Sequence, residues 1–291
     1  MRLLLDLNYW EPGNLSEAVS LLSNLGEKAR PLAGGTDLLV KMKKGPINWS
    51  GIVNLKGLTE LKGINFEGQT ITIGALTPIS ALMANSLVGV HFPVLVEAAR
   101  SLGTPQIRNL ATVGGNLCNA SPAADVALVL LIYEARLLIM GPKGPRKVPV
   151  QEFYAGPGQT VLEPGEILTA VEMDVPPLNS KGVFVKHGKR KSHEIALVNV
   201  AVLITPQPGT KQIARARIAV GAVASTQLRL QEAEESLSDT VVTVDALERA
   251  AELAEAAVNP IDDVRSTAGY RKQMVKVLTK RALQEAWGGE L

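Results

Sequence analysis

The first part of the chain alternates between segments with helical and with strand-like spacing of hydrophobic residues. Apolar side chains recur at helical spacing from Leu15 to Leu25, after a capping residue, Asn14, and before Gly26, which can end a helix. The prolines at 78 and 93 are each expected at the first position of a helix. Strands are expected over residues 30–33, 52–55, 70–75 and 136–140. This alternation predicts a mixed α/β portion.

The second part of the chain has the pattern of a sheet followed by helices. Because the proline pair at 176–177 interrupts both helix and strand, we expect a domain boundary there, between residues 1–177 and residues 178–291. The apolar runs beyond it predict three strands and then two helices, over residues 183–186, 197–204, 213–223, 244–257 and 266–287.

The last predicted helix shows two kinds of side chain. Tyr270, Met274, Val277 and Leu278 are expected to line its core face. Its basic residues are expected to face solvent, although a partner chain could also use them; they are Arg271, Lys272, Lys276, Lys280 and Arg281.

Composition excludes several classes of protein. The 291 residues carry 30 Lys and Arg against 28 Asp and Glu, a net charge of +2, which argues against a dedicated nucleic-acid-binding protein. The single cysteine, Cys118, excludes an internal disulfide and any metal site built from several thiolates of this chain, and we expect it to be a small buried side chain. No apolar stretch is long enough to cross a bilayer and no signal peptide is visible, so we expect a cytoplasmic protein.

Two glycine pairs stand out, since the usual dinucleotide-binding, P-loop, zinc-protease and hydrolase motifs are absent. The first pair lies in Ala33-Gly34-Gly35-Thr36-Asp37, after a predicted strand. Paired glycines allow positive φ and leave consecutive N–H groups open to a ligand, and such a row of donors suits phosphate oxygens. A plain turn would also explain this pair.

The second pair lies in Thr112-Val113-Gly114-Gly115-Asn116, within a polar stretch from Thr104 to Asp125. Burying so many polar groups is costly unless each finds a partner, and a polar ligand would provide one. Asp125 could cap a helix or accept hydrogen bonds from sugar hydroxyls. One ligand with two phosphates, such as a dinucleotide, would suit both pairs, whereas the pattern identifies no catalytic residue.

Five segments, in order along nearly the whole chain, resemble the FAD-binding medium subunit of the molybdenum hydroxylases. This is the family of the xanthine dehydrogenase and aerobic carbon monoxide dehydrogenase flavoproteins. The segments are residues 33–39, 106–125, 156–168, 186–202 and 260–271.

The resemblance implies an α+β fold of the vanillyl-alcohol-oxidase (PCMH) type. Residues 1–177 would form the FAD-binding domain, with two α/β subdomains that meet near residues 55–60. Residues 178–291 would form a C-terminal domain with a three-stranded antiparallel sheet and helices.

The resemblance also implies roles for particular residues around a noncovalent FAD. Both glycine segments would contact its pyrophosphate, and Asp125 would contact a hydroxyl-bearing part of the cofactor. Leu102 and Leu168 would pack near it, and Lys186 would lie by the flavin ring. Lys186 could equally be one more solvated cation, because it begins a basic run that ends at Lys191.

The family's chemistry implies an oxidoreductase subunit that transfers electrons. An iron–sulfur small subunit with [2Fe–2S] clusters would supply electrons, and a large subunit would hold the molybdenum cofactor. The external acceptor would be NAD+, a quinone or oxygen. The alternatives are a free-standing FAD-dependent oxidoreductase of the same fold, acting directly on a small substrate, and a scaffold or sensor without redox work.

Overall fold

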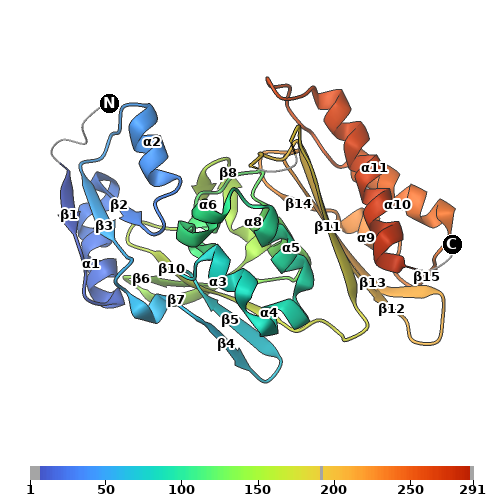
Figure 1. Ribbon diagram of the computed structural model, residues 1–291, viewed down its shortest axis with the longest axis horizontal. Coiled ribbons are helices and arrows are strands. Elements are labelled where there is room, and N and C mark those ends of the chain that lie inside the picture. Colours follow the sequence, from blue (N-terminus) through green and yellow to red (C-terminus); the bar gives the residue numbers. More distant parts are fainter. Residues whose placement is uncertain (1–6, 191–192, 289–291) are drawn as a thin grey trace. The chain divides into compact units, whose positions relative to one another are not determined.

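The computed structural model describes residues 7–190 and 193–288. The chain, coloured along its sequence in Figure 1, divides into two compact units. The first unit comprises Met1–Asn85, Thr104–Asn119 and Ala135–Asp174. The second comprises Ser86–Gly103, Ala120–Glu134 and Val175–Leu291. Each unit is thus assembled from three separate stretches of sequence.

Among the described residues, no helix has both the length and the apolar character needed to cross a membrane.

A three-stranded parallel sheet in the first unit leads into the first glycine segment. Its strands, in spatial order, are β1 (Asn8–Trp10), β3 (Gly51–Asn54) and β2 (Ala29–Leu32). Two helices accompany it, α1 (Leu15–Leu25) and α2 (Leu38–Lys44), with 3₁₀ turns at Gly26–Lys28 and Thr59–Leu61. The side chain of Asn14 accepts a hydrogen bond from the N–H of Glu17 at 2.9 Å, so the predicted helix start is confirmed.

A five-stranded antiparallel sheet forms the rest of the first unit's frame. Its strands, in spatial order, are β4 (Ile64–Glu67), β5 (Thr70–Gly74), β10 (Ile167–Asp174), β6 (Arg136–Gly141) and β7 (Gly144–Pro149). The remaining elements are α3 (Ile79–Ala84), α6 (Pro105–Leu110), α7 (Val113–Cys118), a 3₁₀ turn at Val150–Glu152, and the hairpin β8 (Tyr154–Gly156) and β9 (Gln159–Thr160). Ile71 and Ile73 of β5 are fully buried, as the predicted alternation requires.

The second unit is a sheet with helices on both faces. Three long antiparallel strands, β11 (Lys181–His187), β12 (Val198–Pro206) and β13 (Gln212–Gly221), are extended by the short β14 (Leu228–Arg229) and β15 (Thr240–Val241). Helices α5 (Pro93–Ser101) and α8 (Asp125–Ile132) pack on one face, and α11 (Ala268–Trp287) packs on the other with α10 (Val244–Ala256) beside it, as Figure 1 shows. Two short helices complete the unit, α4 (Ser86–His91) and α9 (Gln231–Glu235).

Burial on both faces explains the sequence of β12. Seven consecutive residues from Val198 are buried, so the strand has a nearly continuous apolar run rather than an alternating one. The same run made this strand predictable.

One sequence expectation on helix starts differs from the structure. Pro93 is the first residue of α5, as predicted, but Pro78 lies just before α3, as its N-cap.

The polar stretch from Thr104 to Asp125, for which no elements were predicted, is largely helical. It folds into α6, α7 and the start of α8, and the first two begin at capping threonines, Thr104 and Thr112.

Candidate functional site

The first glycine segment connects β2 to α2 in the first unit. Gly35 has φ of +76°, a conformation that favours glycine. A Cβ on Gly34 would lie 2.0 Å from the carbonyl oxygen of Leu110, so the backbone of this segment touches the end of α6. In the described part of the chain, the N–H groups of Gly34, Gly35 and Thr36 donate no hydrogen bond. These three donors are available to an anionic ligand.

The second glycine segment uses its N–H groups inside the protein. Gly114 donates to the carbonyl of Ala75 at 2.8 Å, and Gly115 donates to the hydroxyl of Thr112 at 3.0 Å. A Cβ on Gly114 would lie 2.6 Å from the Cβ of Ala75, so glycine is required for packing against the end of β5. The buried Oδ1 of Asn116 has no hydrogen-bond partner in the described structure. Asn116 therefore offers a polar side-chain group here, while the backbone supplies close packing.

The two segments lie together although about 80 positions separate them along the chain. A Cβ on Gly115 would lie 3.8 Å from the Cβ of Ala33. Gly34 also touches Leu110, two residues before the second segment begins. The structure thus brings Ala33–Asp37 and Thr112–Asn116 into one cradle within the first unit. Here "the cradle" denotes these two segments.

Two predicted contact residues are leucines in different units. Leu168 belongs to β10 of the first unit, where it is buried opposite Ile139 beside a bulge. Leu102 is the C-cap of α5 in the second unit and is half-buried. Both positions are compatible with core packing as well as with a ligand contact.

Asp125 and Lys186 form a buried ion pair in the second unit. The Nζ of Lys186 lies 2.6 Å from Oδ2 of Asp125, and the side chains are 14% and 5% exposed. Lys186 also donates to the carbonyl of Ser101 at 3.2 Å. Lys186 is therefore not a solvated cation. Asp125 is the first residue of α8 and does not cap it, because its carboxylate is held by neighbouring side chains.

Asn199 is a member of this cluster that the sequence analysis missed. Its Nδ2 donates to Oδ1 of Asp125 at 2.9 Å, and it is fully buried in the apolar run of β12. An asparagine inside a strand of valines and leucines was the signal that could have found it, because a buried amide needs polar partners. A Cβ on Gly221 would lie 2.3 Å from Oδ1 of Asn199, so the neighbouring strand has glycine there.

The predicted faces of α11 are wrong at one position each, because Arg271 was expected in solvent and Tyr270 in the core. Arg271 is only 2% exposed, and it donates to the carbonyls of Leu197 (3.0 Å) and Ala222 (2.9 Å) and to Asp263 (2.8 Å). Tyr270 is 42% exposed and lies 3.0 Å from Nε2 of His187. The arginine is buried because two strand-end carbonyls and a carboxylate satisfy its guanidinium.

Asp263 anchors the segment that precedes α11. Burial alone would raise the pKa of its carboxyl, but hydrogen bonds from Arg265, from the N–H of Ser266 and from Arg271 outweigh burial and hold that pKa well below its usual range. The conspicuous run of residues 260–266 therefore has a structural role in this unit.

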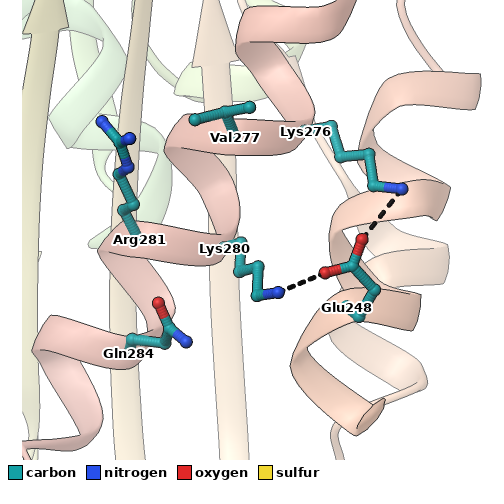
Figure 2. Close-up of a pocket in the computed structure, with 6 residues that line it drawn as sticks. All are labelled: Glu248, Lys276, Val277, Lys280, Arg281 and Gln284. Carbon is teal, nitrogen blue, oxygen red and sulfur yellow. Dashed lines mark hydrogen bonds and ion pairs between the residues drawn. The ribbon is translucent and has the colours of Figure 1, made fainter. Parts of the chain in front are cut away.

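The other basic residues of α11 are partly engaged by α10. Figure 2 shows a hollow lined by Glu248, Lys276, Val277, Lys280, Arg281 and Gln284, in which Glu248 bridges Lys276 and Lys280. Hydrogen bonds from Lys280 and Lys276 lower the pKa of Glu248 to about 2. Within the described ranges, no group of three or more His, Cys, Asp or Glu side chains could hold a metal ion.

Cys118, at the end of α7, is exposed, so the expectation of a buried side chain is wrong. The last residue of the basic run, Lys191, lies outside the described residues.

Two known sequence families match the chain in succession. Residues 5–176 match the family described as the FAD binding domain in molybdopterin dehydrogenase. Residues 184–286 match the CO dehydrogenase flavoprotein C-terminal domain.

Named relatives match over almost their entire lengths. The carbon monoxide dehydrogenase medium chain of Afipia carboxidovorans is 36% identical over 97% of this chain and 96% of its own. The xanthine dehydrogenase FAD-binding subunit of Escherichia coli O157:H7 is 34% identical over 96% of this chain and 95% of its own. The structure of reconstituted CO dehydrogenase from Oligotropha carboxidovorans contains a chain that superimposes with a TM-score of 0.93 at 35% identity, covering 97% of this chain and 98% of that one.

This α+β protein with a glycine-lined cradle is a flavoprotein, because its sequence matches an FAD-binding family. The chain belongs to the family of FAD-binding medium subunits found in molybdopterin dehydrogenases, and it is an oxidoreductase subunit of that family. The predicted fold class and the predicted cofactor, FAD, are confirmed at the level of this family.

The cradle fits the diphosphate part of such a cofactor. In the described structure it presents three unpaired N–H groups, at Gly34, Gly35 and Thr36, which can donate to phosphate oxygens. At Gly34 a Cβ would collide with the backbone of Leu110, so the close approach of the first segment to the end of α6 depends on glycine.

Proposed function

We propose that this chain is the electron-transfer subunit of a molybdenum hydroxylase complex. Electrons would come from a partner iron–sulfur subunit, and the chain would transfer them through FAD to an external acceptor. The observation that carries the proposal is the end-to-end match to chains named as medium chains and FAD-binding subunits of dehydrogenases. The name "medium chain" supports a larger and a smaller partner.

The chain's own contribution is to bind and orient the cofactor. The N–H groups of Gly34, Gly35 and Thr36 would donate to the pyrophosphate oxygens. Thr112 to Asn116 would lie beside that row, where Gly115 approaches Ala33, and the Oδ1 of Asn116 would accept a hydrogen bond from a hydroxyl group of the cofactor. For Asp37, Leu102, Asp125, Leu168 and Lys186, the proposed cofactor contacts rest on the family resemblance alone. Bound FAD can exchange electrons singly or in pairs, so it would connect clusters to a two-electron acceptor.

The cysteine count supports a division of labour between chains. Iron–sulfur clusters are held mainly by several cysteine thiolates, and this chain has one cysteine, Cys118. The clusters and the molybdenum cofactor would therefore belong to the small and large partner subunits. NAD+, a quinone or oxygen would accept the electrons.

We also propose that the functional domains are residues 1–177 and 178–291. The spans of the two matching families, 5–176 and 184–286, support this boundary. Within the first domain, a boundary between subdomains near residues 55–60 is supported by the change of sheet, because the parallel sheet ends with β3 and the antiparallel sheet begins with β4.

Native co-purification, with an absorption spectrum and metal analysis, tests the assembly. Flavin together with iron and molybdenum is expected. Flavin alone, with turnover of a small substrate by the isolated chain, would overturn the proposal in favour of a free-standing oxidoreductase.

The cofactor site is tested by Gly114→Leu, whose side chain has no room beside Ala75. The variant should lose bound flavin. Gly45→Ala is the matched control, since nothing lies within 4 Å of a Cβ there. Full flavin content in Gly114→Leu would contradict the site assignment.

A further inference from the structure

We propose that Lys41, held by Asn119, supplies the positive charge that the cradle needs to bind the FAD diphosphate beside Asp37. The inference rests on the proposed function, because it assigns the charge balance of the same cofactor site. Asp37 was predicted as a site residue from the sequence, whereas Lys41, Asn119 and the hydrogen bonds between these three side chains were not.

The three side chains form a continuous hydrogen-bonded chain. The Nζ of Lys41 donates to Oδ1 of Asn119 at 2.8 Å, and Nδ2 of Asn119 donates to Oδ1 of Asp37 at 3.2 Å. The two contacts span 78 and 82 positions of sequence, so they are not local helix contacts. The side-chain amide of Asn119 therefore binds both the ammonium group of Lys41 and the carboxylate of Asp37.

Asn119 is itself fixed to the second segment. It is the C-cap of α7, and its backbone N–H donates to the carbonyl of Gly115 at 3.0 Å. Because its backbone N–H is bonded to one half of the cradle and its side chain reaches Asp37 in the other half, Asn119 holds the two halves in register. It is a positioning residue, and Lys41 is the charged group that it positions.

Charge balance is the reason for assigning this role to Lys41. A diphosphate carries two negative charges, and Asp37 adds a third at the end of the row of N–H donors. Those donors carry only partial charges, so a full positive charge is needed to offset the carboxylate. Lys41 lies one helical turn after Asp37, at the (i, i+4) position, where opposite charges on a helix are neighbours.

Titration of the full-length apoprotein with FAD at low and high salt tests the proposal. Since Lys41 and Asp37 are exposed, Lys41→Met should weaken FAD binding about fivefold at low salt, and the effect should shrink at high salt because exposed charges are screened. Lys43→Met is the matched control. Lys43 is another exposed lysine of α2, about 200° around the helix from Lys41, and its replacement should change affinity less than about twofold.

A double-mutant cycle separates charge compensation from general damage. If Lys41 offsets Asp37, Asp37→Asn should restore most of the affinity that Lys41→Met loses. In an Asn119→Ala background the coupling between positions 37 and 41 should fall, while the unfolding midpoint of the FAD-free protein stays close to wild type. A structural role alone would leave that coupling unchanged.

Two results would overturn the proposal. The first is equal weakening by Lys41→Met and Lys43→Met, and the second is no recovery in the Asp37→Asn/Lys41→Met double variant. Failure of the proposed function gives a different result. If the chain binds no FAD, the wild type shows no binding at either salt concentration; if it is a free-standing oxidoreductase, co-purification shows flavin without iron and molybdenum, and the effect of Lys41→Met on FAD binding remains.

Discussion

Replacing Gly34 by alanine would place a methyl group where the first segment of the cradle touches the end of α6. The new Cβ would lie 2.0 Å from the carbonyl oxygen and 2.7 Å from the carbonyl carbon of Leu110, whereas ordinary van der Waals contact begins at 3.4 Å. Both nearby atoms belong to the backbone, so no side-chain rotation relieves the collision. The first segment and the end of α6 must therefore separate by about 1 Å or more.

The neighbouring backbone resists this displacement. Ala111 donates to the carbonyl of Ile107 at 2.7 Å and accepts from the N–H of Ile79 at 2.9 Å, which fixes the end of α6. Overpacking of a fixed contact costs about 1–3 kcal/mol, and we expect the upper end of that range here. If the loop moves to relieve the strain, a cost of about 3 kcal/mol appears as roughly a hundredfold weaker FAD binding.

Two measurements on the same variant capture the whole cost. Chemical denaturation of the FAD-free protein reports strain that remains in the folded chain, and titration with FAD reports strain relieved by moving the loop. Gly45→Ala, in open space after α2, should match wild type in both. A Gly34→Ala variant with wild-type stability and wild-type FAD affinity would refute the reasoning about the cradle.

Three further predictions concern the second unit. Lys186→Met should destabilise the protein by about 3 kcal/mol in chemical denaturation, because it leaves the buried Asp125 carboxylate without its cation; adding Asp125→Asn should recover part of the loss. Arg271→Met should cost about 3 kcal/mol by the same measurement, since two carbonyls and Asp263 lose their donor, whereas Lys272→Met should stay within about 0.5 kcal/mol of wild type. Because the pKa of Asp263 is lowered on folding, its carboxylate stabilises the protein above its unfolded pKa of about 4, and that contribution is lost as the pH falls further. The difference in unfolding free energy between wild type and Asp263→Asn should therefore be largest at neutral pH and shrink in acid; a difference that does not depend on pH would contradict the assignment.

Local rules predicted the elements whose ends are decided by nearby residues. Asn14 begins α1 because its side chain reaches an N–H three positions away, and Pro93 begins α5 because its fixed φ suits the first turn. The strand at β12 was predictable from an apolar run that reflects burial on both faces. The glycine segments were found because paired glycines are unusual in a polar stretch.

The pairings within the site could not be predicted, because they join distant parts of the chain. Lys186 meets Asp125 across 61 positions, and Arg271 reaches Leu197 across 74. Helical spacing alone predicted that Arg271 faces solvent. The spacing carries no information about the carbonyl groups of Leu197 and Ala222, which accept its hydrogen bonds in the folded chain. The same limit hid Asn119, whose amide joins residues that only the fold brings together.

The discontinuous second unit has a consequence for how the protein is made. All eight residues of α8 are buried, and the helix packs against β12 and β13 of the same unit. About 90 residues separate the end of α8 from the end of β13, so at roughly 5–20 residues per second a ribosome needs about 5 to 20 s to synthesise the surface that covers it. During that interval this almost wholly hydrophobic segment can pack only against α5, and the face that β12 and β13 cover in the folded unit has no native partner on the nascent chain. Slow synthesis between residues 132 and 221 should therefore favour aggregation, and a chaperone that holds this segment should raise the yield of folded protein.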